Sequence, residues 1–406
     1  MKVVAWFALA VALLQFVHYG LPPGNADLIS VQMLAMDLAH HEDRFLYPGF
    51  AFMQNDAWVA HHEANLRTVS AKRIEPNWCF YPPLVPFLFI PFAKADVETW
   101  RVAWGVLQLA LIALFAELIL RLLRRTGASA APNRILIYAL VFGCFPVALS
   151  EKLGQTSVLV ALFLWGGVYA RLSDGKILAA LGIGSAVFIK PFLALIEIVD
   201  LARRKVWFAL SVAGVTLSLL LISLLATGLH AQVEYWNLLS TLASSQNAFN
   251  GNQSLLATIM RFFSDLSVGD YGFRYDPVVA LYGRMLAAAV VGVAGYAQWK
   301  SGAQNVLAST GLWISAGLLA LPISWDHHLL FLLPVIAYLW TRRWTRTGYG
   351  LLGAATALIC VFAHPFYGES ISGKVAASLP MLGDLILFVF LVTLHVRPRA
   401  FERVHV

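Results

Sequence analysis

The first carboxylate of the chain follows its first apolar stretch, and Asp37, Glu42 and Asp43 come after it. Residues 1–19 are mostly apolar, and Asp27 lies a few positions beyond them in Gly24-Asn-Ala-Asp-Leu28. A carboxylate there can act as general base toward a hydroxyl group if the site keeps it ionised and within hydrogen-bond reach. Residues 28–39 predict an amphipathic helix, and Asp is a favoured helix N-cap, so a purely structural role for Asp27 stays open.

Cationic and imidazole groups recur later in the chain. Lys190 precedes Pro191 between two short apolar segments, which predict a hairpin with Lys190 near its outer tip. A buried ammonium needs an anion, and a lipid phosphate can supply one; snorkelling to the interface is the alternative. His327 and His328, in Ser324-Trp-Asp-His-His328, fall at an outer turn, where an imidazole can donate to a phosphate or relay a proton.

Amide, guanidinium and aromatic groups accompany these charges. Asn252 and Gln253 lead, with Arg261, into a short apolar helix, and such groups can bind sugar hydroxyls and a phosphate, or simply cap a loop. Gln155 lies in a very short outer turn. Tyr81 begins Tyr81-Pro-Pro-Leu84, where an aromatic face can stack on a sugar ring or belong to an interfacial aromatic belt.

Metal and nucleotide sites are not expected. Two triplets, His40-His-Glu42 and His61-His-Glu63, carry metal-ligand residue types. Adjacent histidines do not share one helix face, and the triplets contain no histidine pair at i,i+4 spacing, so we expect no metal ligands there. The sequence has no Walker loop, dinucleotide fingerprint or nucleophile elbow, which argues against a nucleotide-sugar donor and against any cofactor.

The composition is that of a membrane protein. Hydrophobic residues make up 59% of the 406 positions, and the mean hydropathy is +0.71. Apolar stretches recur along nearly the whole length with short polar breaks, which excludes a water-soluble fold and predicts an all-α polytopic bundle. The net charge of +7 comes from short basic clusters such as 121–125 and 203–205, typical of cytoplasmic anchors rather than of nucleic-acid binding.

With the amino terminus inside, the chain predicts about twelve spans, the first of them an uncleaved signal anchor. The predicted spans lie near residues 1–19, 101–123, 135–150, 156–172, 177–189, 191–201, 206–228, 277–299, 306–323, 329–341, 349–364 and 379–396. We expect one membrane domain over residues 1–406.

Two long segments interrupt the regular pattern on the outer side, residues 20–100 and 229–276, and we expect them to form the site. The first ends in Phe80-Tyr-Pro-Pro-Leu-Val-Pro-Phe-Leu-Phe-Ile-Pro-Phe92. Each interior proline costs a helix about 3 kcal/mol, so these four prolines predict an interfacial or re-entrant segment instead of a straight span.

The order and spacing of these motifs resemble glycosyltransferase family 87, which includes bacterial polyprenyl-phosphate-mannose-dependent mannosyltransferases and related arabinofuranosyltransferases of the GT-C superfamily. The resemblance covers roughly residues 20 to 330. The motifs that carry it are Asp27, Leu46-Tyr47, Tyr81-Pro-Pro-Leu84, Gly154-Gln155, Lys190-Pro191, Asn252-Gln-Ser254 with Arg261, and Ser324-Trp-Asp-His-His328.

The resemblance implies a GT-C bundle whose long first outer loop carries juxtamembrane helices, and an inverting transfer from a polyprenyl monophosphate sugar, with mannose expected and arabinofuranose as an alternative. It implies that Asp27 is the catalytic base and that His327 or His328 contacts the donor phosphate together with Lys190 and Arg261. The acceptor would be a lipid or glycan, and the site would lie in the cell membrane and face the periplasm or exterior. The rival interpretation, a secondary transporter, predicts two related halves, and none is visible.

Overall fold

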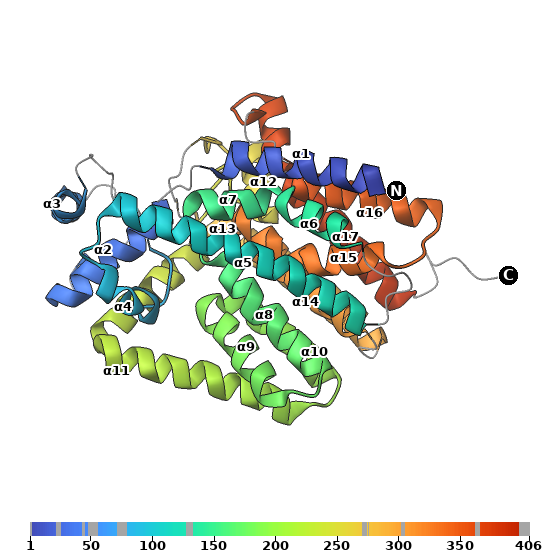
Figure 1. The fold of residues 1–406 in the computed structure, drawn as a ribbon, viewed down its shortest axis with the longest axis horizontal. Coiled ribbons are helices and arrows are strands. Elements are labelled where there is room, and N and C mark those ends of the chain that lie inside the picture. Colours follow the sequence, from blue (N-terminus) through green and yellow to red (C-terminus); the bar gives the residue numbers. More distant parts are fainter. Residues whose placement is uncertain are drawn as a thin grey trace.

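The protein is all-helical over the residues that the computed structural model describes, apart from two isolated β-bridges (Figure 1). The described residues are 2–21, 26–42, 45–47, 56–70, 79–126, 133–269, 274, 276–301, 305–361 and 366–397. Parts of the two predicted outer segments, 20–100 and 229–276, lie outside these ranges.

Five of the described helices are long and apolar enough to cross a membrane. They are α1 (Lys2–Gly20), α5 (Val97–Arg125), α11 (Val206–Ser244), α13 (Pro277–Ser301) and α17 (Ile371–Val396). A sixth crossing is available if α6 (Arg134–Phe142) and α7 (Phe145–Leu153), which bend by 55° at their junction, form one span. The all-helical membrane fold is therefore confirmed in outline, while the predicted number of about twelve spans stays a prediction.

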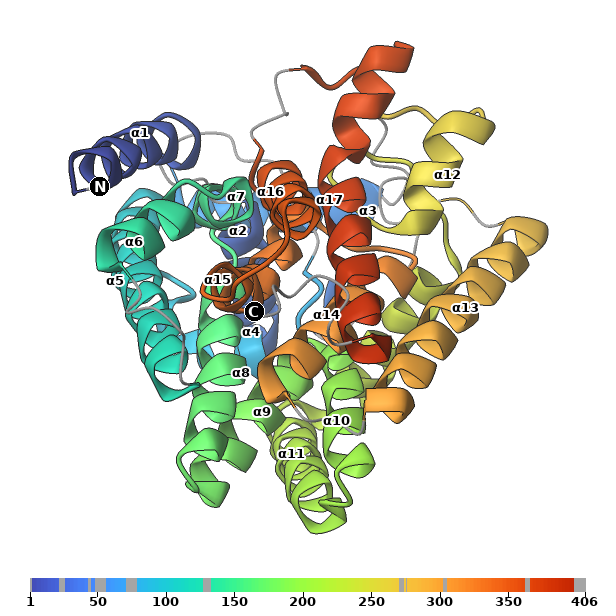
Figure 2. The same cartoon turned by 90° about the vertical axis from the view of Figure 1, so that its right-hand side faces the viewer.

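Shorter helices fall where the other predicted spans lie. They are α8 (Ser157–Leu172), α9 (Lys176–Ile189), 3-10 helix η4 (Pro191–Ile196), α10 (Glu197–Ala202), α14 (Val306–Ala320), 3-10 helix η5 (Asp326–Leu332), α15 (Leu333–Trp340) and α16 (Arg346–Cys360). Figure 2 shows α14 and α15 near the middle of the bundle, surrounded by longer helices. Nearly every residue of α14 and α15 is buried, as expected for helices that are apolar on all sides.

The segment between α1 and α5 forms a cap at one end of the molecule (Figure 1). It contains α2 (Ala26–His40), α3 (Asp56–Val69), α4 (Leu84–Leu88) and 3-10 helix η3 (Ile90–Phe92). The proline-rich stretch is broken into short helical turns, as predicted. The amphipathic pattern predicted for α2 is wrong, because residues 28–38 are all buried against the cap and the bundle.

Helix α11 runs past the predicted end of its span. Gly228 adopts φ 81° and ψ 166°, a non-helical conformation that only glycine tolerates readily, and it divides α11 into two helices that meet at a kink. Residues 229–244 therefore form a helix rather than the start of a polar loop, and they pack onto the cap through Ala231, Tyr235 and Leu238.

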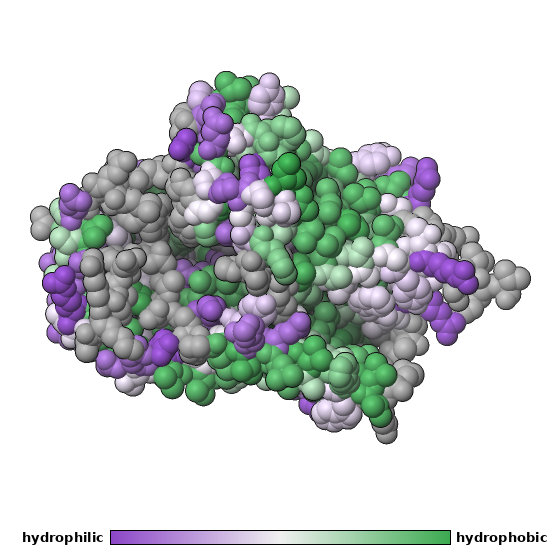
Figure 3. All heavy atoms as spheres, turned by 90° about the horizontal axis from the view of Figure 1, so that it is seen from above, coloured by the Kyte–Doolittle hydropathy of each residue, from purple (hydrophilic) through white to green (hydrophobic). Residues whose placement is uncertain are grey.

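On the face drawn in Figure 3, hydrophobic residues gather to the right of the centre, and hydrophilic residues lie at both ends and in smaller clusters between. This distribution suits a bundle whose long axis crosses the apolar layer of a membrane. The cap of α2 to α4 would then lie at one membrane surface.

Candidate functional site

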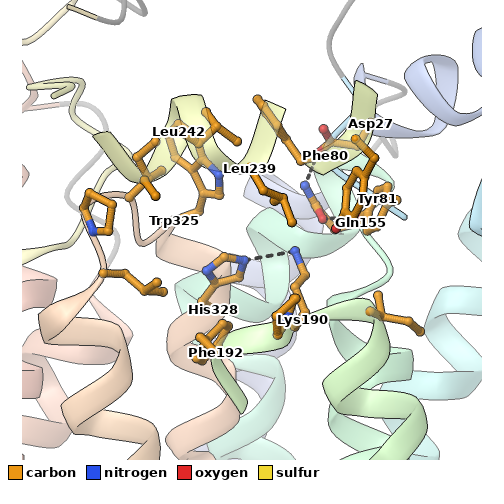
Figure 4. A pocket seen from close by; sticks show the side chains of 17 residues that line it. Asp27, Phe80, Tyr81, Gln155, Lys190, Phe192, Leu239, Leu242, Trp325 and His328 are labelled. Atoms are coloured by element: carbon orange, nitrogen blue, oxygen red, sulfur yellow. Dashed lines mark hydrogen bonds between the residues drawn. The ribbon is translucent and has the colours of Figure 1, made fainter. Parts of the chain in front are cut away.

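A pocket of about 220 Å³ lies where the cap meets the bundle. Figure 4 shows Asp27, Gln155 and Tyr81 on one side of this pocket and Lys190 with His328 facing them. The wall is completed by Phe80, Ile189, Pro191, Phe192, Tyr235, Leu239, Leu242, Ala243, Leu321, Pro322, Ile323 and Trp325. Segments that are far apart in the chain thus bring together five of the nine residues expected at the site.

Asp27 lies in the first turn of α2, where the helix dipole favours a negative charge. The amide nitrogen Nε2 of Gln155 donates a hydrogen bond to its Oδ2 atom, and the Tyr81 hydroxyl donates to the Oε1 atom of the same amide. Tyr81, Gln155 and Asp27 therefore form a chain that fixes the carboxylate at the pocket wall.

The turn that carries Gln155 is itself tightly held. Gly154 ends α7 with φ 70°, a left-handed conformation that suits glycine and lets the backbone N–H of Gln155 donate to Ser150 at 2.9 Å. The Trp104 indole donates to the Gly154 carbonyl at 3.1 Å, and the Gln108 amide donates to the Gln155 carbonyl. These buried contacts set the position from which Gln155 reaches Asp27.

Burial raises the pKa of Asp27 from 3.8 to about 7, although nearby Lys190 and the Gln155 hydrogen bond act in the opposite direction. A carboxyl group with that pKa is partly ionised at neutral pH and is basic enough to take a proton from a reacting hydroxyl. The electrostatics of the site thus suit Asp27 to general base catalysis.

Lys190 terminates α9 and is followed at once by Pro191, which begins η4. The two predicted half-length helices therefore do meet at Lys190. The ammonium Nζ donates to Nε2 of His328 at 3.1 Å and lies 5.3 Å from the centre of the Tyr81 ring. Only part of its donor capacity is used by His328, so Lys190 can also bind an anion in the pocket.

His328, and not His327, lines the pocket. Because Nε2 of His328 accepts from Lys190, Nδ1 carries the ring proton, and Nδ1 has no hydrogen-bond partner among the described residues. The two imidazole rings lie edge to face with centres 4.6 Å apart, so His327 packs directly behind the wall.

Asn252 and Gln253, which we expected to contact substrate, do not line the pocket. The Asn252 side chain accepts from the Ser324 N–H at 2.8 Å and donates to the Pro322 carbonyl at 3.1 Å. The Gln253 amide donates to the Ala377 carbonyl at 2.9 Å. Both amides are fully buried: that of Asn252 holds in place the segment that supplies Trp325 and His328 to the pocket, and that of Gln253 joins its own loop to α17.

Arg261, which we expected to contact the donor phosphate, does not line the pocket either. Its guanidinium is fully buried and donates to the backbone carbonyls of Ala248 at 3.1 Å, Phe249 at 2.8 Å and Ala377 at 3.1 Å, and to that of Asn252. These acceptors occupy the planar donor fork that would otherwise bind a phosphate.

The second half of α11 belongs to the segment 229–276 that we expected to form the site, but it contributes as a helix. Tyr235, Leu239 and Leu242 line the pocket, although the sequence predicted a polar loop there. Apolar residues at 231, 235, 238 and 242 follow the i,i+4,i+7 spacing of a helix face, and this signal could have identified the extension.

A second group of ligand-type side chains lies elsewhere in the cap. Asp37, His61 and His62 place one potential metal-ligating atom each within 4.8 Å of one another. They do not line the pocket and are considered separately below.

Comparison with known proteins supports the resemblance seen in the motifs. A relative from Mycobacterium tuberculosis, a polyprenol-phosphate-mannose-dependent alpha-(1-2)-phosphatidylinositol mannoside mannosyltransferase, is 26% identical over 303 residues, which cover 67% of this chain. The chain spans 64% of the length of that curated relative. No solved structure matches the chain.

The family match covers most of the pocket. Residues 78–324, more than half of the chain, match the model of glycosyltransferase family 87, and this range includes Tyr81, Gln155 and Lys190. Asp27 lies well before this range and His328 just after it, and both join the pocket through the fold. On this match, the chain belongs to glycosyltransferase family 87.

Proposed function

We propose that this protein transfers a sugar, with mannose as the first candidate, from a polyprenyl monophosphate to a hydroxyl group of a lipid or glycan at the outer face of the cell membrane. One observation carries the proposal. A single pocket holds a carboxylate with raised pKa, Asp27, opposite an ammonium group, Lys190, that is oriented by His328. The family supports glycosyl transfer, and the polyprenol-phosphate-mannose dependence of the mycobacterial relative supports the donor class.

The proposed reaction is a single inverting displacement. Asp27 removes the proton from the acceptor hydroxyl as the acceptor oxygen attacks the anomeric carbon. The bond from that carbon to the phosphate oxygen breaks, and polyprenyl phosphate leaves with the bonding electrons. Lys190 stabilises the negative charge that develops on the phosphate, while its contact with His328 keeps the ammonium pointed into the pocket.

The apolar wall suits the lipid part of such a donor. Leu239 and Leu242 on α11 face the pocket, whereas Val233 and Trp236 of the same half-helix are exposed on its outer surface. In a membrane, this half of α11 would have lipid on one side and the pocket on the other. A polyprenyl chain could then pass along α11 with its phosphate at Lys190 and its sugar near Asp27.

The donor class can be tested in proteoliposomes that contain the purified protein and a membrane lipid extract as acceptor. Polyprenyl-phosphate-[³H]mannose should yield labelled product, and nucleotide-linked mannose should not. Lys190→Met should abolish labelling because the leaving phosphate loses its cation, whereas Lys205→Met, outside the pocket, should leave labelling unchanged. Equal use of the nucleotide donor, or undiminished labelling by a well-folded Lys190→Met protein, would refute the proposal. If labelled product forms only from polyprenyl-phosphate-arabinofuranose, the donor sugar is arabinofuranose and the donor is still a polyprenyl monophosphate.

A further inference from the structure

The cap contains a buried ionisable cluster that the proposed reaction does not use. Asp37, near the end of α2, has a fully buried side chain that meets two adjacent histidines of α3. Its Oδ1 atom lies 2.9 Å from Nε2 of His61, and its Oδ2 atom lies 2.8 Å from Nε2 of His62. Asp37 is ten residues beyond Asp27 on the same helix, about 15 Å along the axis, so this cluster is separate from the pocket.

The hydrogen bonds of His62 fix where its proton lies. Its Nδ1 atom is 3.0 Å from the backbone carbonyl of Trp58, which can only accept, so Nδ1 carries the hydrogen. In the neutral ring Nε2 is then unprotonated, yet it points at a carboxylate oxygen 2.8 Å away. Two lone pairs at that distance repel each other, so a positive charge, either a second proton or a metal ion, has to lie between them.

His61 meets several groups at one nitrogen. Its Nε2 atom lies 2.9 Å from Asp37, 3.2 Å from an Oε2 atom of Glu42 and 3.1 Å from the Asn65 amide nitrogen. If Nε2 of His61 accepts from the Asn65 amide, it has no proton to give to either carboxylate. Two carboxylates and two imidazoles therefore converge with a formal charge of −2, which one divalent cation would neutralise.

The arrangement matches zinc in ligand type and spacing. Zinc prefers four nitrogen, sulfur or carboxylate ligands at about 2.0–2.2 Å, which places tetrahedral ligand atoms about 3.3 Å apart. The observed contacts of 2.8–3.2 Å lie a few tenths of an ångström below this spacing, and the ligand atoms of Asp37, His61 and His62 all lie within 4.8 Å of one another, so the side chains have to shift to admit the ion. The Nδ1 bond from His62 to a backbone carbonyl is the kind of second contact that orients zinc-bound histidines.

Aromatic side chains enclose the cluster. The Phe45 ring stacks on His61 with centres 3.8 Å apart and planes 11° apart, and the Trp58 ring lies 4.2 Å from His62. This packing excludes water from most of the group and fixes the imidazoles before any ion binds.

We propose that Asp37, Glu42, His61 and His62 form a zinc site that fastens α3 to α2. The sequence argument against a metal fails because one carboxylate offers an oxygen to each of two adjacent histidines, so the rings need not share a helix face. The role is structural: within the cap, the ion holds α3 against α2, the helix that carries Asp27.

The test is metal content and thermal unfolding of the full-length protein, purified in detergent without a polyhistidine tag. The wild type should contain about one zinc per chain; a chelator should lower its unfolding temperature, and added zinc should restore it. His61→Gln should reduce bound zinc at least about tenfold. His40→Gln, which changes an exposed histidine in the same cap, should bind zinc as the wild type does.

Two outcomes would overturn the proposal. In the first, the wild type contains no zinc after zinc addition and its unfolding temperature does not respond to chelator. In the second, His61→Gln and His40→Gln contain equal amounts of zinc. A protonated Asp37–histidine cluster gives the first of these. Glu42→Gln, whose side chain is 37% exposed, provides a second ligand variant if His61→Gln does not fold. Neither readout depends on sugar transfer, so this inference and the proposed function can fail independently.

Discussion

At the scale of single residues, the site depends on which groups surround Asp27 and Lys190. The types and order of Asp27, Tyr81, Gln155, Lys190 and His328 were enough to predict a shared site, and the fold does bring them to one pocket. The hydrogen-bond chain from Tyr81 through Gln155 to Asp27 could not be predicted, because it depends on how α2 packs against the turn after α7.

The pH dependence of transfer should report the ionisation of Asp27. With its pKa at about 7, the carboxylate is protonated below that pH and cannot accept a proton, so the rate should rise with pH through about 7. Gln155→Leu removes a hydrogen bond that lowers the pKa of Asp27, so the rise should move to higher pH. A profile of kcat/KM against pH measures both, and a rise near pH 4, or no shift in the variant, would speak against Asp27 as the base.

The two histidines should differ in their effect on transfer. His328 contacts Lys190 at the pocket wall, so His328→Gln should lower kcat/KM at least about tenfold. His327→Gln, a matched change one residue away and behind the wall, should have a much smaller effect in protein of equal unfolding temperature. The opposite ranking would exchange the roles of the two residues.

At the scale of elements, apolar periodicity located most helices but not their extent or surroundings. The four prolines correctly predicted that residues 80–92 do not form one straight helix. The polar residues after Gly228 suggested a loop, whereas their helical spacing continues α11 to Ser244. The burial of α2 on all sides comes from the cap that covers it, and no property of that segment alone reveals such tertiary packing.

Arg261 tests whether the segment behind the pocket is structural. Arg261→Met should leave several buried carbonyls unpaired and destabilise the fold by roughly 3 kcal/mol, while the donor KM of the folded fraction should stay unchanged. Arg284→Met, which changes an exposed arginine of α13, is the control. A raised donor KM at an unchanged unfolding temperature would indicate instead that Arg261 binds the donor phosphate.

At the scale of the whole molecule, hydropathy predicted a helical membrane protein but cannot count its crossings. A helix of 15 residues such as α14 is about 22 Å long, shorter than the apolar layer of about 30 Å. Because α14 is buried among other helices, its apolar side chains pack in the protein core, and contact with lipid would require the same apolar sequence. Length and composition therefore leave the number of spans open.

The proposed orientation places the cap outside and the 203–205 cluster inside. In intact cells, an impermeant thiol reagent should label His40→Cys, at an exposed position of the cap. Arg204→Cys should be labelled only after the membrane is permeabilised. The reverse pattern would put the pocket on the cytoplasmic side and contradict transfer at the outer face.

The most direct test of the central claim is sugar transfer from polyprenyl-phosphate-mannose by the wild type, Asp27→Asn and Asp56→Asn in the same proteoliposomes. Asp56 is an exposed carboxylate of the cap and serves as the matched control. The proposal predicts that Asp27→Asn loses transfer by about 10²–10⁴-fold at an unchanged unfolding temperature, while Asp56→Asn keeps it. Equal transfer by all three proteins would contradict the assignment of Asp27 as the base.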